Sequence, residues 1–135
     1  MKLLKLDQGQ FTVHAVCDER GKPALLEFLE GLGANLKANG VGMIQLLKRC
    51  AQHGPPKNSD LKHHLGDGIC ELRKGQLRVL YFTDKGRVII CSHGLIKKTG
   101  KVPTKDINRA NTARDRYLNA RHLNQLEILE EDDHG

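Results

Sequence analysis

Apolar and polar residues alternate over residues 11–17, where Phe11, Val13, Ala15 and Cys17 form the apolar set. This alternation predicts a β-strand. After Gly21-Lys22-Pro23 the spacing changes, and Leu25, Phe28, Leu29 and Leu32 recur at helical intervals. A helix is therefore expected to begin near Pro23 and to end at Gly31-Leu32-Gly33. A second helix is expected over about residues 35–52, with five apolar residues buried: Leu36, Met43, Ile44, Leu47 and Ala51.

Three strand-like runs follow a loop rich in Pro and Gly at residues 53–60. The runs are Ile69–Arg73, Leu77–Thr83 and Arg87–His93, and Lys74-Gly75 and Lys85-Gly86 separate them. Short glycine-containing turns between strands predict an antiparallel meander.

A last helix is predicted to open at Pro103, with Asp106 in its first turn, where the helix dipole favours an acid. Its apolar stripe contains Ile107, Ala110, Tyr117 and Leu118. The element order predicts an α+β domain, in which two helices pack on one face of a small, mostly antiparallel sheet. The other face of that sheet is expected to be partly open.

Strand parity predicts which side chains share the open face. If both turns contain two residues, Glu71 pairs with Arg78, Arg78 pairs with His93, and Leu80 pairs with Cys91. Glu71, Arg78 and His93 would then form a row across three strands, with Arg73 on the same face. The parity would continue to Lys97, whereas a turn with an odd number of residues would break the row.

This row has the chemistry of a phosphodiester site. The guanidiniums of Arg73 and Arg78 can bind a phosphate and stabilise the added charge of its transition state. His93 or Glu71 can accept a proton. A cluster of carboxylates suited to two metal ions is missing from the motif, so we expect cleavage without a metal or other cofactor. The alternative is a solvated charged face with a Glu71–Arg78 ion pair.

Composition and charge narrow the class of protein. The 135 residues suit one domain, and 39% apolar residues with 28% charged ones are typical of a globular protein. The net charge of +6 combines an acidic end with a basic body, since residues 127–135 contain five acids and no Lys or Arg. The other 126 residues carry 22 bases and 16 − 5 = 11 acids, a balance of +11, which favours a polyanionic partner.

The location expected for the chain is the cytosol. Its first residues lack the pattern of a signal peptide, and its apolar runs are too short for a membrane span. Cys17, Cys50, Cys70 and Cys91 are dispersed within apolar patterns, which is typical of reduced, buried thiols. The acidic end is expected to be solvated and mobile, and a bolder hypothesis is that it screens the basic cleft as a phosphate mimic.

Several motifs together resemble the HigB-type, phage-derived branch of the RelE/ParE toxin superfamily. They are Gly68-Ile69-Cys70-Glu71-Leu72-Arg73, Arg78-Val79-Leu80-Tyr81-Phe82, His93-Gly94-Leu95-Ile96-Lys97-Lys98-Thr99 and Pro103-Thr104-Lys105-Asp106-Ile107. The resemblance covers roughly residues 11–120. It implies a compact RelE-like fold, which divides the chain into an N-terminal segment (1–10), a toxin domain (11–126) and an acidic tail (127–135).

The resemblance also implies a function. Many members of the superfamily are toxins of type II toxin–antitoxin pairs and cleave mRNA without a metal, usually in the ribosomal A site. The partner implied is a small antitoxin, commonly a helix-turn-helix protein, through which the complex binds operator DNA. The alternatives are a non-catalytic, ParE-like toxin that binds a protein such as gyrase, and an inactive phage-derived member of the fold.

The family's functional positions map onto this chain only in part. Its sheet arginines correspond to Arg73 and Arg78, and its basic position after the strands corresponds to Lys97 or Lys98. Glu71 stands where RelE-like members have a catalytic lysine, only Lys62 lies near the position of a further family lysine, and the late tyrosine has no counterpart. Arg109 and Arg116 of the last helix are expected to add non-specific affinity for RNA.

Overall fold

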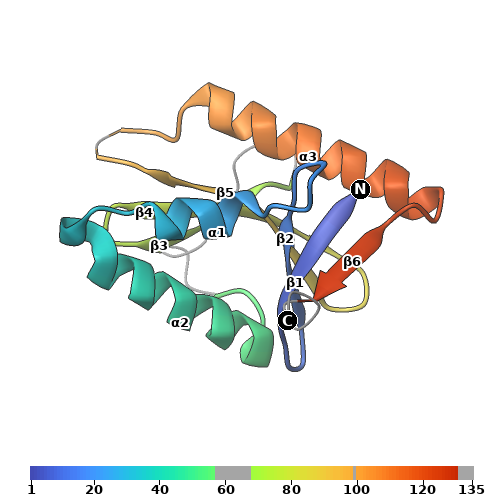
Figure 1. Cartoon of the computed structure of the whole chain (residues 1–135), viewed down its shortest axis with the longest axis horizontal. Helices are drawn as coiled ribbons and strands as arrows, with labels where there is room; N and C mark the ends of the chain where they lie inside the picture. The colour runs from blue at the N-terminus through green and yellow to red at the C-terminus, as the bar shows by residue number, and fades with distance from the viewer. Residues whose placement is uncertain (57–67, 99, 131–135) are drawn as a thin grey trace.

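The computed structural model describes residues 1–56, 68–98 and 100–130 (Figure 1). The N-terminal part of the described chain contains strands β1 (Lys2–Gln8) and β2 (Thr12–Val16), helix α1 (Ala24–Glu30), a 3-10 turn (Ala34–Leu36) and helix α2 (Lys37–His53). The rest contains strands β3 (Cys70–Lys74), β4 (Leu77–Asp84) and β5 (Val88–Ile96), helix α3 (Thr104–His122) and strand β6 (Glu127–Glu130). The fold is therefore α+β, as the sequence predicts.

One mixed sheet joins all six of these strands in the order β3-β4-β5-β2-β1-β6. The pairs β3–β4, β4–β5 and β1–β2 are antiparallel. The pairs β2–β5 and β1–β6 are parallel, and in each pair a long connection between the two strands makes this direction possible. This arrangement is consistent with a RelE-like fold.

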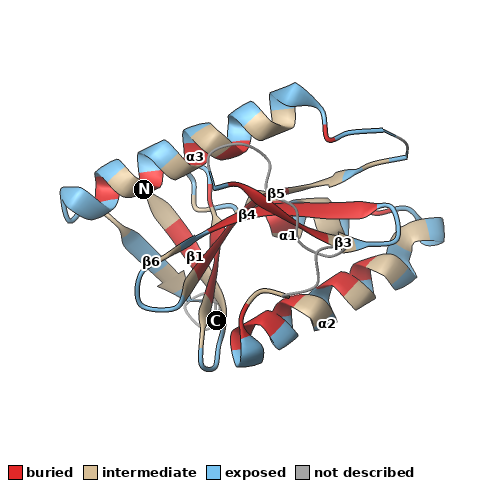
Figure 2. Cartoon of the chain, turned by 180° about the vertical axis from the view of Figure 1, so that it is seen from behind, coloured by how far each residue is buried: buried red, intermediate tan, exposed pale blue. Residues whose placement is uncertain are grey.

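Helices cover both faces of the sheet (Figure 2). Leu25 of α1 and Met43 of α2 pack with Val79 and Tyr81 in one core cluster. On the opposite face, Ala110, Ala113 and Tyr117 of α3 pack with Leu80 and Phe82. The prediction of a partly open face is wrong for this region, because α3 returns across the sheet and its small residues allow close approach.

The β3–β4 hairpin has a different register from the predicted one. The turn is Gly75-Gln76, so Arg73 faces Arg78 and Glu71 faces Leu80. Gly75 has a φ of 57°, and a glycine with positive φ at the first central position is the pattern of a type II′ turn. The predicted Glu71–Arg78 pairing is wrong by two residues, but a two-residue slip leaves each side chain on its predicted face.

A β-bulge divides the pairing between β4 and β5 into two segments with different registers. Three residues, 85–87, connect the strands, which alone would reverse the parity of β5. Ser92 is the extra residue where the pairing changes from Tyr81–Cys91 to Leu80–His93. His93 consequently keeps its predicted face, whereas Cys91 lies on the opposite one. The predicted Arg78–His93 and Leu80–Cys91 pairs are wrong, and Arg78 faces Leu95.

Both ends of the described chain belong to the sheet. The pattern assigned no element to residues 1–10, yet residues 2–8 form β1, and Leu3 is fully buried. The expectation of a solvated, mobile end is wrong for Glu127–Glu130, which pairs with β1 as β6. The remaining tail residues, 131–135, lie outside the described residues.

The helices differ from the sequence prediction in detail. Ile44 was expected in the core, but 41% of it is exposed, and Cys50 takes a buried position instead. All four cysteines are buried and reduced, as predicted. Among the described residues, none of the helices has the length and apolar character needed to span a membrane.

Candidate active site

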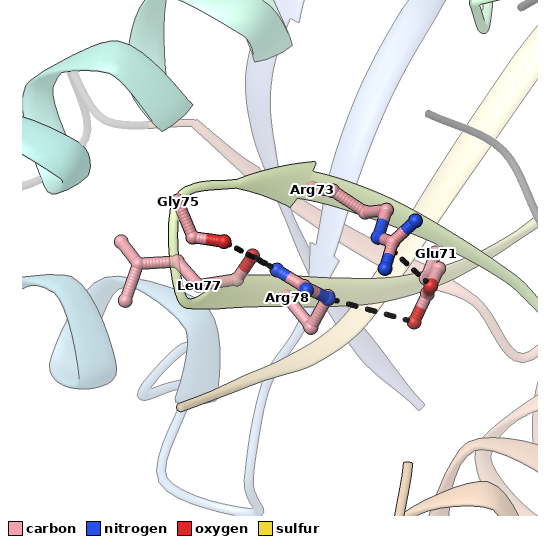
Figure 3. Close-up of polar contacts among 5 residues, drawn as sticks. All are labelled: Glu71, Arg73, Gly75, Leu77 and Arg78. Atoms are coloured by element: carbon pink, nitrogen blue, oxygen red, sulfur yellow. Dashed lines mark hydrogen bonds and ion pairs between the residues drawn. The ribbon is translucent and has the colours of Figure 1, made fainter. Parts of the chain in front are cut away.

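The β3–β4 hairpin brings together two arginines and one glutamate (Figure 3). Glu71 Oε1 lies 3.4 Å from Arg73 Nε, and Glu71 Oε2 lies 4.0 Å from Arg78 Nε. The strand pairing places Arg73 and Arg78 directly opposite each other, so their like charges need the shared carboxylate between them. We call Glu71, Arg73 and Arg78 the hairpin cluster.

Arg78 also holds the turn of the hairpin. Its Nη1 donates to the carbonyl oxygens of Gly75 at 2.7 Å and of Leu77 at 2.8 Å. Burial and the neighbouring charge of Arg73 lower the pKa of Arg78, and the carboxylate of Glu71 offsets only part of that effect. Arg78 is therefore a fixed charge whose orientation depends on the backbone of the turn.

The members of the cluster differ in exposure. The side chain of Arg73 is 31% exposed, that of Arg78 is 9% exposed, and that of Glu71 is 3% exposed. Glu71 Oε2 and Arg78 Nε are buried and have no hydrogen-bond partner. Arg73 is thus the cation that solvent reaches most easily, while the other two lie beneath it with hydrogen-bonding capacity left over.

Two further predicted cations lie at the end of β5. The backbone N–H of Lys97 donates to the carbonyl oxygen of Gln76 at 2.8 Å, so Lys97 follows β5 beside the turn of the hairpin. Arg78 pairs with Leu95, and Lys97 follows Leu95 by two residues, so the prediction that Lys97 shares the sheet face of Arg78 is confirmed. Lys98 is exposed. Lys62 lies outside the described residues.

His93 does not join the hairpin cluster in a row. It is 2% exposed and lies under the first turn of α3, where its Nε2 is 3.0 Å from Asp106 Oδ1. Its Nδ1 is 2.8 Å from Ser92 Oγ. The neutral tautomer with a proton on Nε2 satisfies both contacts, since Nε2–H donates to Asp106 and the Ser92 hydroxyl donates to Nδ1.

Burial is the main reason that the pKa of His93 is lowered, and the charge of Arg109 adds to it. The hydrogen bond to Asp106 acts in the opposite direction but does not compensate. Sequence reasoning missed this partnership because the Ser92 bulge and the return of α3 create it. The only signal available was the acid in the first turn of a helix that follows β5.

Arg109 and Arg116 lie on α3, outside the β3–β4 hairpin. Both are exposed, and both line a groove of about 400 Å³ between α1, β2 and α3. Asp18, Lys22 and Glu27 line the opposite wall, and sequence reasoning did not single them out. Within the described ranges, the side chains do not form a group of three or more potential metal ligands.

The hairpin cluster can bind an anion at Arg73 and stabilise additional negative charge through Arg78. The α+β fold is consistent with a RelE-like fold, and both arginines of the cluster lie on the hairpin at one edge of its sheet. Residues 27–115 match the model of the phage-derived protein Gp49-like family (DUF891). The chain therefore belongs to this family of HigB-like toxins. None of the curated proteins matches the chain.

Proposed function

We propose that the protein is the toxin of a type II toxin–antitoxin pair and that it cleaves mRNA. The observation that carries the proposal is the hairpin cluster, in which two guanidiniums share one carboxylate on a single sheet face. Membership of a HigB-like toxin family supports it. The cleavage reaction would be accelerated because the arginines stabilise the negative charge of the transition state and because the substrate's own 2′-hydroxyl is held in position for attack.

Each member of the hairpin cluster has a role in this proposal. Arg73 binds the phosphate, because it is the most exposed of the three. Arg78 supplies a second charge from below, and Lys97 or Lys98 orients the RNA backbone beside the turn. The 2′-oxygen attacks phosphorus, a 2′,3′-cyclic phosphate forms, and the bond to the 5′-oxygen breaks as that oxygen takes a proton from water.

Glu71 is the better placed of the two predicted proton acceptors. Both ring nitrogens of His93 are engaged by Ser92 and Asp106, whereas Glu71 Oε2 has no hydrogen-bond partner. Among the described residues this oxygen is paired only with Arg78, at 4.0 Å, and a carboxylate oxygen without a hydrogen bond can take the proton of the 2′-hydroxyl. His93 then acts on the site only by fixing β5 against α3.

The first test is induction of the protein in cells, followed by mapping of transcript ends. We expect translation to stop and mRNA to be cut. Arg73→Ala should reduce cleavage by about 10²–10³-fold, the range seen when one charge-stabilising donor is removed. Arg49→Ala removes an exposed arginine from α2 and should leave cleavage unchanged. Equal toxicity of wild type and Arg73→Ala would contradict the proposed site.

Arg78→Ala and Glu71→Gln separate the roles within the cluster. Arg78→Ala should abolish toxicity, and a melting curve will show how much of the loss comes from the two turn hydrogen bonds. Glu71→Gln keeps the shape of the side chain but removes the base. It should reduce cleavage while RNA binding is retained, and unchanged cleavage would exclude Glu71 as the proton acceptor.

One observation favours a second candidate, a toxin that binds a target protein without catalysis. Both potential bases, Glu71 and His93, are 2% exposed. Toxicity with intact transcripts, in cells and in translation extracts, would support this candidate.

The proposed partner is a small helix-turn-helix antitoxin that also carries the complex to operator DNA. An adjacent short reading frame of that kind should suppress toxicity when it is expressed together with this chain. Failure of the adjacent frame to suppress toxicity would count against the pairing.

A further inference from the structure

The groove between α1 and α3 contains cations that the hairpin cluster does not use. Arg109, Thr112 and Arg116 recur at three- and four-residue spacing, so α3 presents them on one face. Lys22 lies on the opposite wall. None of the ion pairs among the described residues involves Lys22, Arg109 or Arg116. The groove is lined by three basic side chains and two acids, a balance of 3 − 2 = +1, and this excess of positive charge favours an anionic ligand.

The acids of the groove restrict what that anion can be. Asp18 Oδ1 accepts the backbone N–H groups of Arg20 at 2.8 Å and Lys22 at 2.9 Å, and it therefore holds the loop before α1. Glu27 lines the groove without such a bond among the described residues. A run of carboxylates would be repelled by Glu27, whereas a ligand with both phosphates and hydrogen-bond donors can satisfy both walls.

The floor and size of the groove suit a nucleoside. Val16, Cys17, Ala24 and Ala113 provide an apolar floor, and the volume of about 400 Å³ lies in the range of small-ligand sites. A cavity of about 200 Å³ continues from Cys17, Asp18 and Arg116 toward Lys2. The groove thus has room for one nucleotide and an exit for the adjoining strand.

From these observations we infer that the groove is a nucleotide subsite for single-stranded RNA. Arg109 and Arg116 bind the phosphates on either side of one nucleoside, and the base lies on the apolar floor. The carboxylate of Glu27 accepts a hydrogen bond from a base amino group. The inference rests on the proposed function and adds to it a second RNA contact, formed by elements other than β3 and β4.

The test uses the full chain and an RNA octamer with 2′-O-methyl groups at every position, which removes the nucleophile and prevents cleavage. One 4-thiouridine allows cross-linking under near-ultraviolet light. We expect cross-links in the peptides that contain residues 16–27 and 109–116. Cross-links confined to other parts of the chain would overturn the inference.

Charge reversal provides the quantitative arm of the test. Arg109→Glu with Arg116→Glu should weaken octamer binding at least tenfold. The plot of the logarithm of the association constant against the logarithm of the salt concentration should become less steep by about 1.4, because two phosphate contacts are lost. The matched control is Arg49→Glu with Lys105→Glu, which changes the net charge equally at exposed positions outside the groove. An equal loss of affinity in both double variants would overturn the inference, and circular dichroism will verify that each folds.

Two comparisons separate this inference from its alternatives. A glutamate-rich peptide should compete poorly with the octamer, and preferential binding of that peptide would overturn the RNA assignment. Cleavage by the wild type in translation extracts tests the proposed function independently. If the groove cross-links form but mRNA is not cleaved, the proposed nuclease activity is rejected and the nucleotide subsite is retained. If mRNA is cleaved but no cross-links form in the groove, the subsite is rejected and the nuclease activity is retained.

Discussion

Buried polar residues connect the layers of this molecule. His93 links β5 to α3 through Asp106, and Tyr117 links α3 to β4 by donating a 2.5 Å hydrogen bond to Asp84 Oδ2. Arg121 donates to the other oxygen of the same carboxylate. Burial alone would raise the pKa of Asp84, but the hydrogen bonds from Tyr117 and Arg121 are stronger influences together, and the pKa is lowered.

The pH dependence of stability is expected to follow His93. Its pKa in the folded state lies below the ordinary value of 6.5, so the unfolded chain binds the proton more tightly. The free energy of unfolding should therefore be highest above about pH 6.5 and should fall as the pH drops through the folded-state pKa. The measurement is urea unfolding at several pH values from 7.5 to 5.

His14 is a second group that we expect to contribute to the same decline. Its pKa is also lowered, first by burial and then by the charge of Lys5, and its Nδ1 has no hydrogen-bond partner. Each histidine should contribute in the same direction. His93→Gln should flatten the decline and His14→Gln should flatten it separately. A decline that is unchanged in both variants would show that other groups control it.

At the level of elements, the hairpin that carries the arginines depends on its contact with α2. Asn39 Nδ2 donates to the carbonyl oxygen of Lys74 at 3.4 Å. A Cβ added at Gly75 would lie 1.6 Å from the same Nδ2 atom. The positive φ of Gly75 and its close neighbour therefore both require glycine at the position that accepts a hydrogen bond from Arg78.

Gly75→Ala and Gly86→Ala form a matched pair. Both glycines have positive φ, but a Cβ at Gly86 would meet nothing within 4 Å. Gly86→Ala should cost about 1 kcal/mol of unfolding free energy from backbone strain alone. Gly75→Ala should cost about 2–4 kcal/mol because the clash with Asn39 adds to that strain. Equal costs in chemical denaturation would show that α2 yields freely to the hairpin.

At the scale of the whole molecule, Glu127 and Glu130 of the acidic end lie at the opposite edge of the sheet from the hairpin cluster. β6 forms one edge and β3 forms the other, with four strands between them. Glu130 pairs with Lys5 of the neighbouring strand at 2.7 Å. Glu127 and Glu130 are therefore not adjacent to the hairpin cluster, and we expect that they do not screen it.

Removing these two charges provides a prediction. Glu127→Gln with Glu130→Gln should change cleavage at the hairpin cluster less than twofold at low salt, since both side chains are exposed and lie at the opposite edge of the sheet. The unfolding free energy should fall by no more than about 1 kcal/mol, because the Lys5–Glu130 pair is on the surface. A tenfold rise in cleavage would show that these carboxylates do screen the hairpin cluster.

The sequence by itself determined most of the elements, the α+β class and the face of the sheet on which the site residues lie. These depend on local periodicity, and side-chain parity survives a two-residue slip such as the one at Gly75. It also indicated the family through the motifs around Arg73, Arg78 and Lys97. The periodicity did not reveal β1 or β6, because their pairing joins the two ends of the described chain.

Only the tertiary structure decided which residues meet. The bulge at Ser92 and the return of α3 sequester His93 with Asp106, while the turn at Gly75 fixes Arg78 above Glu71. The groove lined by Arg109, Arg116 and Glu27 likewise forms from segments far apart in the chain. Such contacts depend on register, turn length and helix placement, which long-range packing selects and local spacing does not encode.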